Sequence, residues 1–167
     1  MPNLLLRTRQ GNDIPNETSF MDLGDISRED KDFRKSLPNG SSPVNFGTQV
    51  YNCHGLVFAA RRSWVFDKGT INIILGDDEY ATINEKDAWI GDIVLYWSGE
   101  ICEHSGLVIE NAKNTVLGIP RILSKFGHLS EVVHYAHICG IYSGSPRTYH
   151  RVTTVQQRDA ALSNPQG

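Results

Sequence analysis

The sequence predicts an α+β domain in which one buried helix packs against a small antiparallel sheet of sequential strands. Apolar residues recur at helical spacing over residues 53 to about 64. Two runs rich in β-forming residues, 91–97 and 102–110, then follow with a short turn between them. The length of 167 residues suits one compact core and is short for two.

The N-terminal residues 1–47 form a polar arm. They are rich in Asn, Asp, Ser, Gly and Pro and show no sustained hydrophobic period. We expect loops with a short helix that begins near Ser27, because serine is a good N-cap and acidic residues suit the first turn. This helix should stop by residues 38–40, which read Pro-Asn-Gly.

A buried amphipathic helix is predicted over residues 53 to about 64. One face of this helix carries Leu56, Val57, Ala60 and Trp64. Arg61 and Arg62 come late in the run, where cations suit the negative end of the helix dipole. The helix must cover one face of the sheet.

The predicted sheet begins after this helix. Residues 71–75 and 91–97 are rich in β-formers, and the strand over about 102–110 pairs with 91–97 as a hairpin across the turn at residues 98–100. Shorter candidate elements follow at residues 115–117, 121–126 and 132–142.

The C-terminal residues 145–167 are expected to form a loose tail with at best a short helix over about 156–162. The expected organisation is therefore the polar arm, a core over residues 48–144 and this tail.

Composition excludes several classes of partner. The net charge of −3 gives no reason to expect nucleic acid, and no stretch approaches the roughly 18 apolar residues of a membrane span. Only three apolar residues run together before Arg7, too few for the apolar region of a signal peptide. We expect synthesis in the cytosol without a Sec-type address, which leaves export by another secretion system open.

The three cysteines show no paired spacing typical of a disulfide framework, so at least one thiol should be free. His134, His137 and Cys139 lie close in sequence but lack the C-x₂-C or H-x₃-H spacing of structural zinc sites. The sequence therefore predicts no metal site and no organic cofactor.

Cys53 and His104 are the candidate nucleophile and base. Cys53 begins the predicted helix, where the helix dipole and the free backbone N–H groups favour a thiolate. His104 lies on a strand of the sheet that the helix covers, so its imidazole can accept the thiol proton and activate the sulfur. The free N–H groups can also stabilise an oxyanion during acyl transfer.

Alternation along residues 102–110 divides the side chains between two faces. His104 shares its face with Gly106, Val108 and Glu110, and the other face carries Ser105, Leu107 and Ile109. The small Gly106 should leave room for the end of the helix to approach His104.

Three segments occur in a familiar order. Residues 52–57 read Asn-Cys-His-Gly-Leu-Val, residues 91–96 Gly-Asp-Ile-Val-Leu-Tyr and residues 104–108 His-Ser-Gly-Leu-Val. They resemble the Asp-Cys-Ser-Gly-Leu-Val, Gly-Asp-Leu-Val-Phe-Phe and His-Val-Gly-Ile-Tyr motifs of the NlpC/P60 cysteine hydrolases, which have a papain-like fold. A second likeness is to uncharacterised bacterial proteins with an Asn-Cys-His-Gly motif and a later Ser-Lys-Trp-Gly segment, here residues 124–127, followed by a histidine matching His134.

The resemblance implies a cysteine peptidase or amidase that cleaves an amide through a thioester, in typical members within peptidoglycan peptides. It makes Cys53 the nucleophile and His104 the base. The third polar residue of the family is usually His, Asn or Gln and falls near Ser124 here. His134 is the leading substitute, and Glu110 and His128 are further ones.

Asn52 and His54 flank the nucleophile and are the candidate substrate-binding residues. His54 replaces the serine that often follows the nucleophile in the family, which implies a substrate pocket unlike that of typical cell-wall enzymes.

Two other functions stay open. The first is a noncatalytic binding module on the same fold, in which the pocket is retained without the chemistry. The second is a toxin or effector, such as a deamidase or protease acting on proteins, for which an immunity or inhibitor protein would be a partner.

Overall fold

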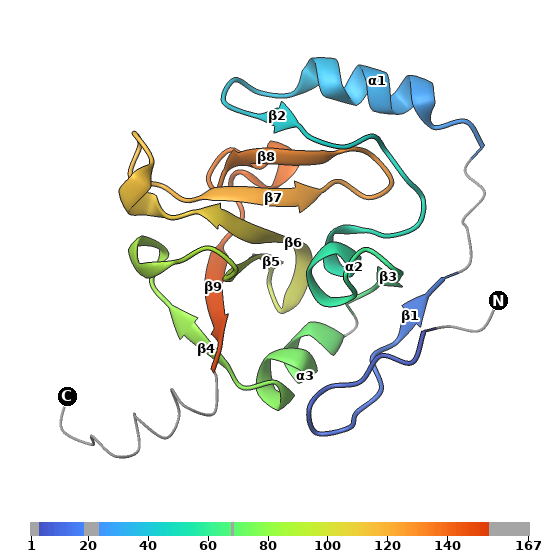
Figure 1. Ribbon diagram of the computed structural model, residues 1–167, viewed down its shortest axis with the longest axis vertical. Helices are drawn as coiled ribbons and strands as arrows, with labels where there is room; N and C mark the ends of the chain where they lie inside the picture. The colour runs from blue at the N-terminus through green and yellow to red at the C-terminus, as the bar shows by residue number, and fades with distance from the viewer. Residues whose placement is uncertain (1–3, 19–23, 68, 154–167) are drawn as a thin grey trace.

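The computed structural model describes residues 4–18, 24–67 and 69–153, and its elements are labelled in Figure 1. Seven strands form one sheet in the order β2-β8-β7-β6-β5-β9-β4, and every pairing in it is antiparallel. Their bounds are β2 Ser42–Pro43, β4 Tyr80–Ile83, β5 Ile93–Ser98, β6 Ile101–Glu110, β7 Arg121–Lys125, β8 Glu131–Tyr135 and β9 Arg147–Val152. The class is α+β, as the sequence predicts.

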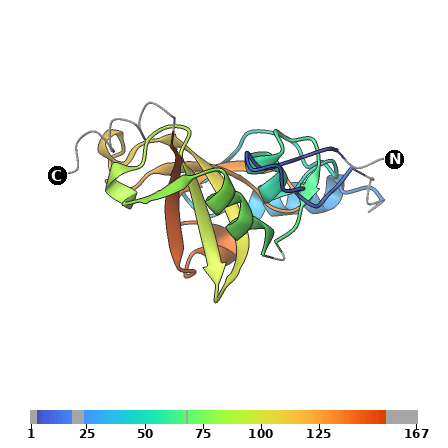
Figure 2. The same ribbon diagram turned by 90° about the horizontal axis from the view of Figure 1, so that it is seen from below.

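The remaining elements surround this sheet. A separate two-stranded sheet pairs β1 with β3. The bounds are β1 Asn16–Glu17, α1 Ser27–Ser36, α2 Cys53–Phe58, β3 Trp64–Val65, α3 Thr70–Asp77, η1 Glu85–Asp87, η2 Ala112–Asn114 and η3 Gly140–Tyr142, where η marks a 3₁₀ helix. In Figure 2, α1 and α2 lie toward one end of the molecule and β4 and β9 toward the other. Within the described residues, no helix has the length and apolar character needed to cross a membrane.

Strands β5 to β8 follow one another as an antiparallel meander. The predicted hairpin is confirmed: β5 pairs with β6, and Tyr96 lies opposite His104. The register shifts after Tyr96, so that Trp97 lies opposite Cys102. Because of this bulge, the side-chain alternation at the start of β6 is out of step with that of the rest of the strand.

The two faces of the sheet carry separate apolar clusters. One cluster combines Ile93 and Leu95 of β5 with Ala59 beyond α2 and with Ile71 and Ile74 of α3. The other contains side chains from alternate positions of the strands together with the segment after β8, and its members include Val94, Tyr96, Val108, Ile122, Ala136 and Cys139. Helices α2 and α3 therefore pack on the first face, and the segment that includes η3 packs on the second.

Helix α1 is held to the β7–β8 hairpin by its one buried acid. Asp30 accepts hydrogen bonds from the backbone N–H of Ser130 at 2.7 Å, from its hydroxyl at 2.7 Å, and from the N–H of Gly47 at 3.0 Å. A side chain at Gly47 would collide with the carbonyl of His128, 2.9 Å from the position of a Cβ. The polar arm is thus joined to the core by a specific contact.

Helix α2 is shorter than the predicted helix over 53 to about 64. It ends at Phe58, and Ala60 and Arg61 adopt left-handed conformations, with φ of 48° and 64°. The chain then folds back over the helix, because the carbonyl of Ser63 lies 1.9 Å from where a Cβ on Gly55 would be. This close return, which only glycine permits at position 55, replaces the last turns that the apolar spacing suggested.

Residues 71–75, which are rich in β-formers, lie in helix α3 instead of a strand. The carboxylate of Asp67 accepts hydrogen bonds from the N–H groups of Gly69 and Ile71 at the start of the helix. Ile71 and Ile74 are buried at helical spacing. A capping acid three residues before the helix outweighs the β propensity of a short isoleucine-rich run.

The chain after Gly144 also differs from the expected loose tail. Strand β9 lies between β5 and β4, so residues 147–152 belong to the interior of the sheet, and β4 itself is an edge strand that the sequence did not indicate. Residues 115–117 form a turn. The short helix expected over about 156–162 lies outside the described residues.

Candidate active site

Cys53 is the first residue of α2, and Asn52 fixes the position of this turn. The side-chain oxygen of Asn52 accepts hydrogen bonds from the N–H of Gly55 at 2.8 Å and of Val65 at 3.1 Å. Its amide donates to the carbonyl of Val65 at 2.7 Å. Asn52 therefore caps α2 and joins it to β3, so its amide group is fully engaged within the fold.

The sulfur of Cys53 is buried against β6. The side chain is 6% exposed. Burial raises the pKa of the Cys53 thiol to about 11, although hydrogen bonds from the backbone of Ser105 and His54 act to lower it. At neutral pH the group is thus a thiol in this structure, and its activation requires a base that takes the proton.

His54 points from α2 into the sheet and is also fully engaged. Its Nδ1 lies 2.9 Å from the hydroxyl of Ser105, and its Nε2 lies 3.1 Å from the carbonyl of Cys102. Burial lowers the pKa of His54. The predicted substrate-binding pair of Asn52 and His54 thus holds the first turn of α2 in place on the sheet.

His104 lies on the opposite face of β6 from α2. Its ring is 1% exposed and packs between aromatic neighbours: the centroid of Tyr142 is 4.5 Å away with the planes inclined by 11°, and that of Phe126 is 4.9 Å away. Within the described residues, the Nε2 of His104 has no hydrogen-bond partner. Burial, with smaller effects from His134 and His54, keeps the pKa of His104 well below its ordinary value.

The candidate nucleophile and base approach the same point of β6 from two sides. The sulfur of Cys53 contacts the backbone of Ser105, the residue that directly follows His104. Tyr142, which stacks on His104, also senses the nucleophile: burial chiefly raises the pKa of Tyr142, and a charge on Cys53 raises it further. The sequence predicted that the helix would lie on the same face of the strand as His104 and so bring Cys53 near it. This prediction is wrong, because α2 lies on the other face. Gly106 does not face α2 but Ile122, whose Cγ2 lies 2.4 Å from where a Cβ would be.

Ser124 and His134, the candidate third members, bond to each other. The Ser124 hydroxyl lies 2.7 Å from the Nε2 of His134, and the Nδ1 of His134 lies 2.8 Å from the carbonyl of Tyr135. The sulfur of Cys139 is 3.7 Å from the same Nε2. This buried cluster belongs to the face of the sheet that carries His104, but its ring nitrogens are already engaged.

The two further substitutes lie elsewhere. Glu110 is at the far end of β6, opposite Arg121 of β7. His128 lies in the β7–β8 turn, where its Nε2 is 3.0 Å from the carboxylate of Glu29 on α1. Neither is joined to His104 by a hydrogen bond.

Glu131, which the motifs did not indicate, connects both flanks of α2. Its carboxylate accepts hydrogen bonds from the hydroxyl of Tyr51 at 2.6 Å, just before the helix, and from the Nε of Arg61 at 2.6 Å, just after it. Arg61 donates again through Nη2 at 3.2 Å, and Asn45 donates a fourth hydrogen bond at 2.8 Å. Burial acts to raise the pKa of Glu131, but these hydrogen bonds together lower it.

Lys125 completes this buried group of charges. Its side chain is fully buried, its Nζ donates to the carbonyl of Leu129, and the Nζ lies 5.0 Å from the centre of the Tyr51 ring. Burial lowers the pKa of Lys125 to about 8, while Glu131, Asp30 and a charge on Cys53 act to raise it. Lys125 directly follows Ser124 in a predicted strand. The sequence could have indicated it as a buried charge with a partner, because a lysine inside an apolar strand is rarely buried unless it is paired.

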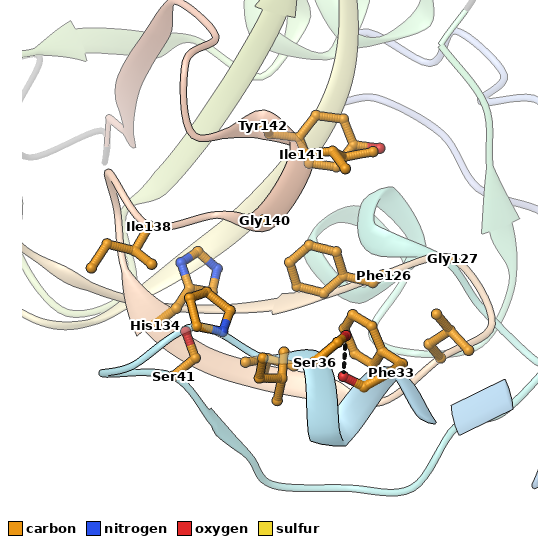
Figure 3. Close-up of a pocket in the computed structure, with 14 residues that line it drawn as sticks. Phe33, Ser36, Ser41, Phe126, Gly127, His134, Ile138, Gly140, Ile141 and Tyr142 are labelled. Carbon is orange, nitrogen blue, oxygen red and sulfur yellow. Dashed lines mark hydrogen bonds between the residues drawn. The ribbon is translucent and has the colours of Figure 1, made fainter. Parts of the chain in front are cut away.

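An apolar cavity lies beside the aromatic rings that pack on His104. It has a volume of about 490 Å³ and lies between α1, the β7–β8 hairpin and η3 (Figure 3). Phe126, His134 and Tyr142 are part of its lining. Among the residues that the structure describes, no three side chains of His, Cys, Asp or Glu come together as metal ligands.

No model of a known protein family, no curated protein and no solved structure matches the chain.

Proposed function

We propose that this protein is a cysteine hydrolase of papain-like fold, similar to the NlpC/P60 enzymes, in which Cys53 attacks an amide carbonyl. The observation that carries the proposal is the buried imidazole of His104, whose Nε2 is unpartnered within the described residues. This free ring nitrogen supplies the acceptor of a general base; no hydrogen bond joins it to the Cys53 sulfur in this structure, so the proposal requires the two side chains to come within hydrogen-bond reach when substrate binds.

The reaction takes two steps. His104 accepts the thiol proton, the sulfur adds to the carbonyl carbon, and the C–N bond breaks as His104 returns the proton to the leaving amine. This leaves a thioester on Cys53. Water then gives a proton to His104 and attacks the thioester carbon, and the C–S bond breaks to release a carboxylic acid and restore the thiol.

A Cys–His dyad fits these contacts better than a triad. The ring of His104 is oriented by stacking against Tyr142 and Phe126. Ser124 and His134 bond to each other and support the strand neighbouring His104. The lowered pKa of His104 keeps its ring neutral at pH 7, so a lone pair is available for the thiol proton.

A noncatalytic binding module on the same fold is the second candidate. Its support is the burial that raises the pKa of the Cys53 thiol to about 11, since an activated cysteine has a lowered pKa. On this alternative the Cys53 thiol is inert and only the neighbouring cavity binds a ligand.

Alkylation by iodoacetamide at pH 6, located by mass spectrometry of the Cys53 peptide, separates the two candidates. The hydrolase requires Cys53 to react much faster than a free thiol, and His104→Ala to remove this advantage. Alkylation slower than a free thiol in both proteins would overturn the hydrolase and support the binding module. Cys102 and Cys139, both buried, are internal references in the same digest.

Peptide or peptidoglycan amides are the proposed substrates, with an immunity or inhibitor protein as partner if the protein is an exported toxin. Expression in the cytosol and in the periplasm of a bacterial host tests this. Lysis only in the periplasm would identify peptidoglycan, and toxicity confined to the cytosol would indicate a protein substrate. Cys53→Ala must remove either effect.

A further inference from the structure

The cavity beside η3 has an uncharged lining. None of its fourteen residues is Asp, Glu, Lys or Arg. Its walls are mainly aliphatic and aromatic, with Phe33 of α1 and Phe126 in contact at a centroid distance of 5.3 Å. Its volume of about 490 Å³ falls within the range of small-molecule sites.

Two polar side chains in the wall, those of His134 and Ser36, are already paired. Both ring nitrogens of His134 have partners, Ser124 and the carbonyl of Tyr135. The hydroxyl of Ser36 donates to the carbonyl of Phe33 at 2.8 Å (Figure 3). Burial lowers the pKa of His134 to about 4, so this ring is neutral at pH 7. The lining therefore favours an occupant without charge.

The cavity shares two of its walls with the candidate active site. Phe126 and Tyr142 line the cavity and also pack against the imidazole of His104. Figure 3 shows the ring of Phe126 between η3 and α1, and the ring of Tyr142 beside η3. A group held there would contact the same two rings that pack on His104.

We propose that this cavity binds an uncharged apolar or aromatic group of the substrate, next to the bond that Cys53 attacks. The identification of the occupant as a substrate group rests on the proposed hydrolase. The chemical class, a neutral apolar group, rests on the lining alone. Such a substrate differs from the charged stem peptides of peptidoglycan and resembles a peptide or acyl amide with a bulky hydrophobic side chain.

Binding of the fluorescent apolar probe N-phenyl-1-naphthylamine to the Cys53→Ala protein tests the site without any chemistry. We expect saturable binding that weakens by about tenfold in Ile141→Asp, because a carboxylate at the mouth of the cavity must be desolvated beside the probe. Ile141 lines the cavity but is 86% exposed, so its replacement removes little core packing. The matched control is Val116→Asp, at an apolar residue that is 97% exposed and is not part of the lining.

A second pair of variants narrows the cavity. Ser36→Trp adds an indole from α1 and should reduce probe affinity about tenfold, whereas Asp32→Trp on the same helix, outside the lining, should leave it unchanged. Equal affinities within both pairs, or no saturable binding, would overturn the proposal. A dimer in sedimentation that dissociates in Ile141→Asp would also overturn it, by making a second copy the occupant. Because the probe does not require Cys53, loss of probe binding and loss of alkylation at Cys53 are separate failures.

Discussion

The imidazole of His104 and the phenol ring of Tyr142 are stacked almost parallel, with centroids 4.5 Å apart. Tyr142 comes from η3, a short 3₁₀ turn that follows β8 and is half open to solvent. One of the aromatic rings that pack on the candidate base thus comes from a small peripheral segment. Access to His104 depends on how that ring is placed.

Removing this cover should restore the titration of His104. In Tyr142→Ala we expect the pKa of His104 to rise toward its ordinary value of 6.5, because burial is the main cause of its lowering. The titration of the ring C–H signals in an NMR spectrum measures this. Ile141→Ala changes the exposed neighbour of Tyr142 and should leave the pKa of His104 as it is; a low pKa in both variants would show that Tyr142 is not the cover.

The neutral state of His134 makes stability depend on pH. Burial lowers its pKa from 6.5 to about 4, so below pH 6.5 the unfolded chain binds a proton that the folded protein does not. The contribution of His134 to the free energy of unfolding is complete above pH 6.5. It falls by up to ~3 kcal/mol as the pH falls to 4. Urea unfolding at a series of pH values should show this loss in the wild type and a flatter profile in His134→Gln. His128→Gln, in a half-buried turn, is the control and should retain the wild-type slope.

Glu131→Gln should destabilise the protein by about 3 kcal/mol, because it leaves Arg61 and the buried Lys125 without their shared counter-charge. Urea unfolding at pH 7 measures the change. Glu103→Gln, at an exposed position of β6, is the matched control and should shift the free energy of unfolding by less than about 0.5 kcal/mol. Equal effects of the two substitutions would contradict the role assigned to Glu131.

Asn52→Ala should cost about 2 kcal/mol of stability. The substitution removes the cap of α2 and leaves the backbone N–H and carbonyl of Val65 without their bonds to Asn52. Asn84→Ala removes an exposed asparagine whose amide lies 3.4 Å from Asp87, and it should be nearly neutral in the same unfolding experiment. An unchanged free energy of unfolding in Asn52→Ala would show that the backbone groups of Gly55 and Val65 find other hydrogen-bond partners.

The sheet could be read from the sequence where local pattern and pairing agree. The β5–β6 hairpin follows from two β-rich runs across a tight turn, and its alternation correctly separates Ser105 and Leu107 from His104 and Val108. The end of α2 could not be read in this way. It depends on the close return of Ser63 over Gly55, a contact between residues whose conformation no local period encodes.

The candidate site was predicted in part. Cys53 at the start of a helix and His104 on β6 are observed, but the side of the sheet on which the helix lies was not recoverable, because alternation assigns residues to faces without saying which face a helix covers. Glu131 was missed because its partners Tyr51 and Arg61 lie 80 and 70 residues away in sequence.

The place of β9 has a consequence for how the chain is made. Residues 147–152 are the last described strand, yet they fill the position between β5 and β4. While the chain emerges from the ribosome, the backbone groups of β5 on that side have no partner, although the rest of the meander is already present. The nascent protein therefore passes through a stage with an open, apolar strand edge. Truncation before Arg147 would make that stage permanent and favour aggregation.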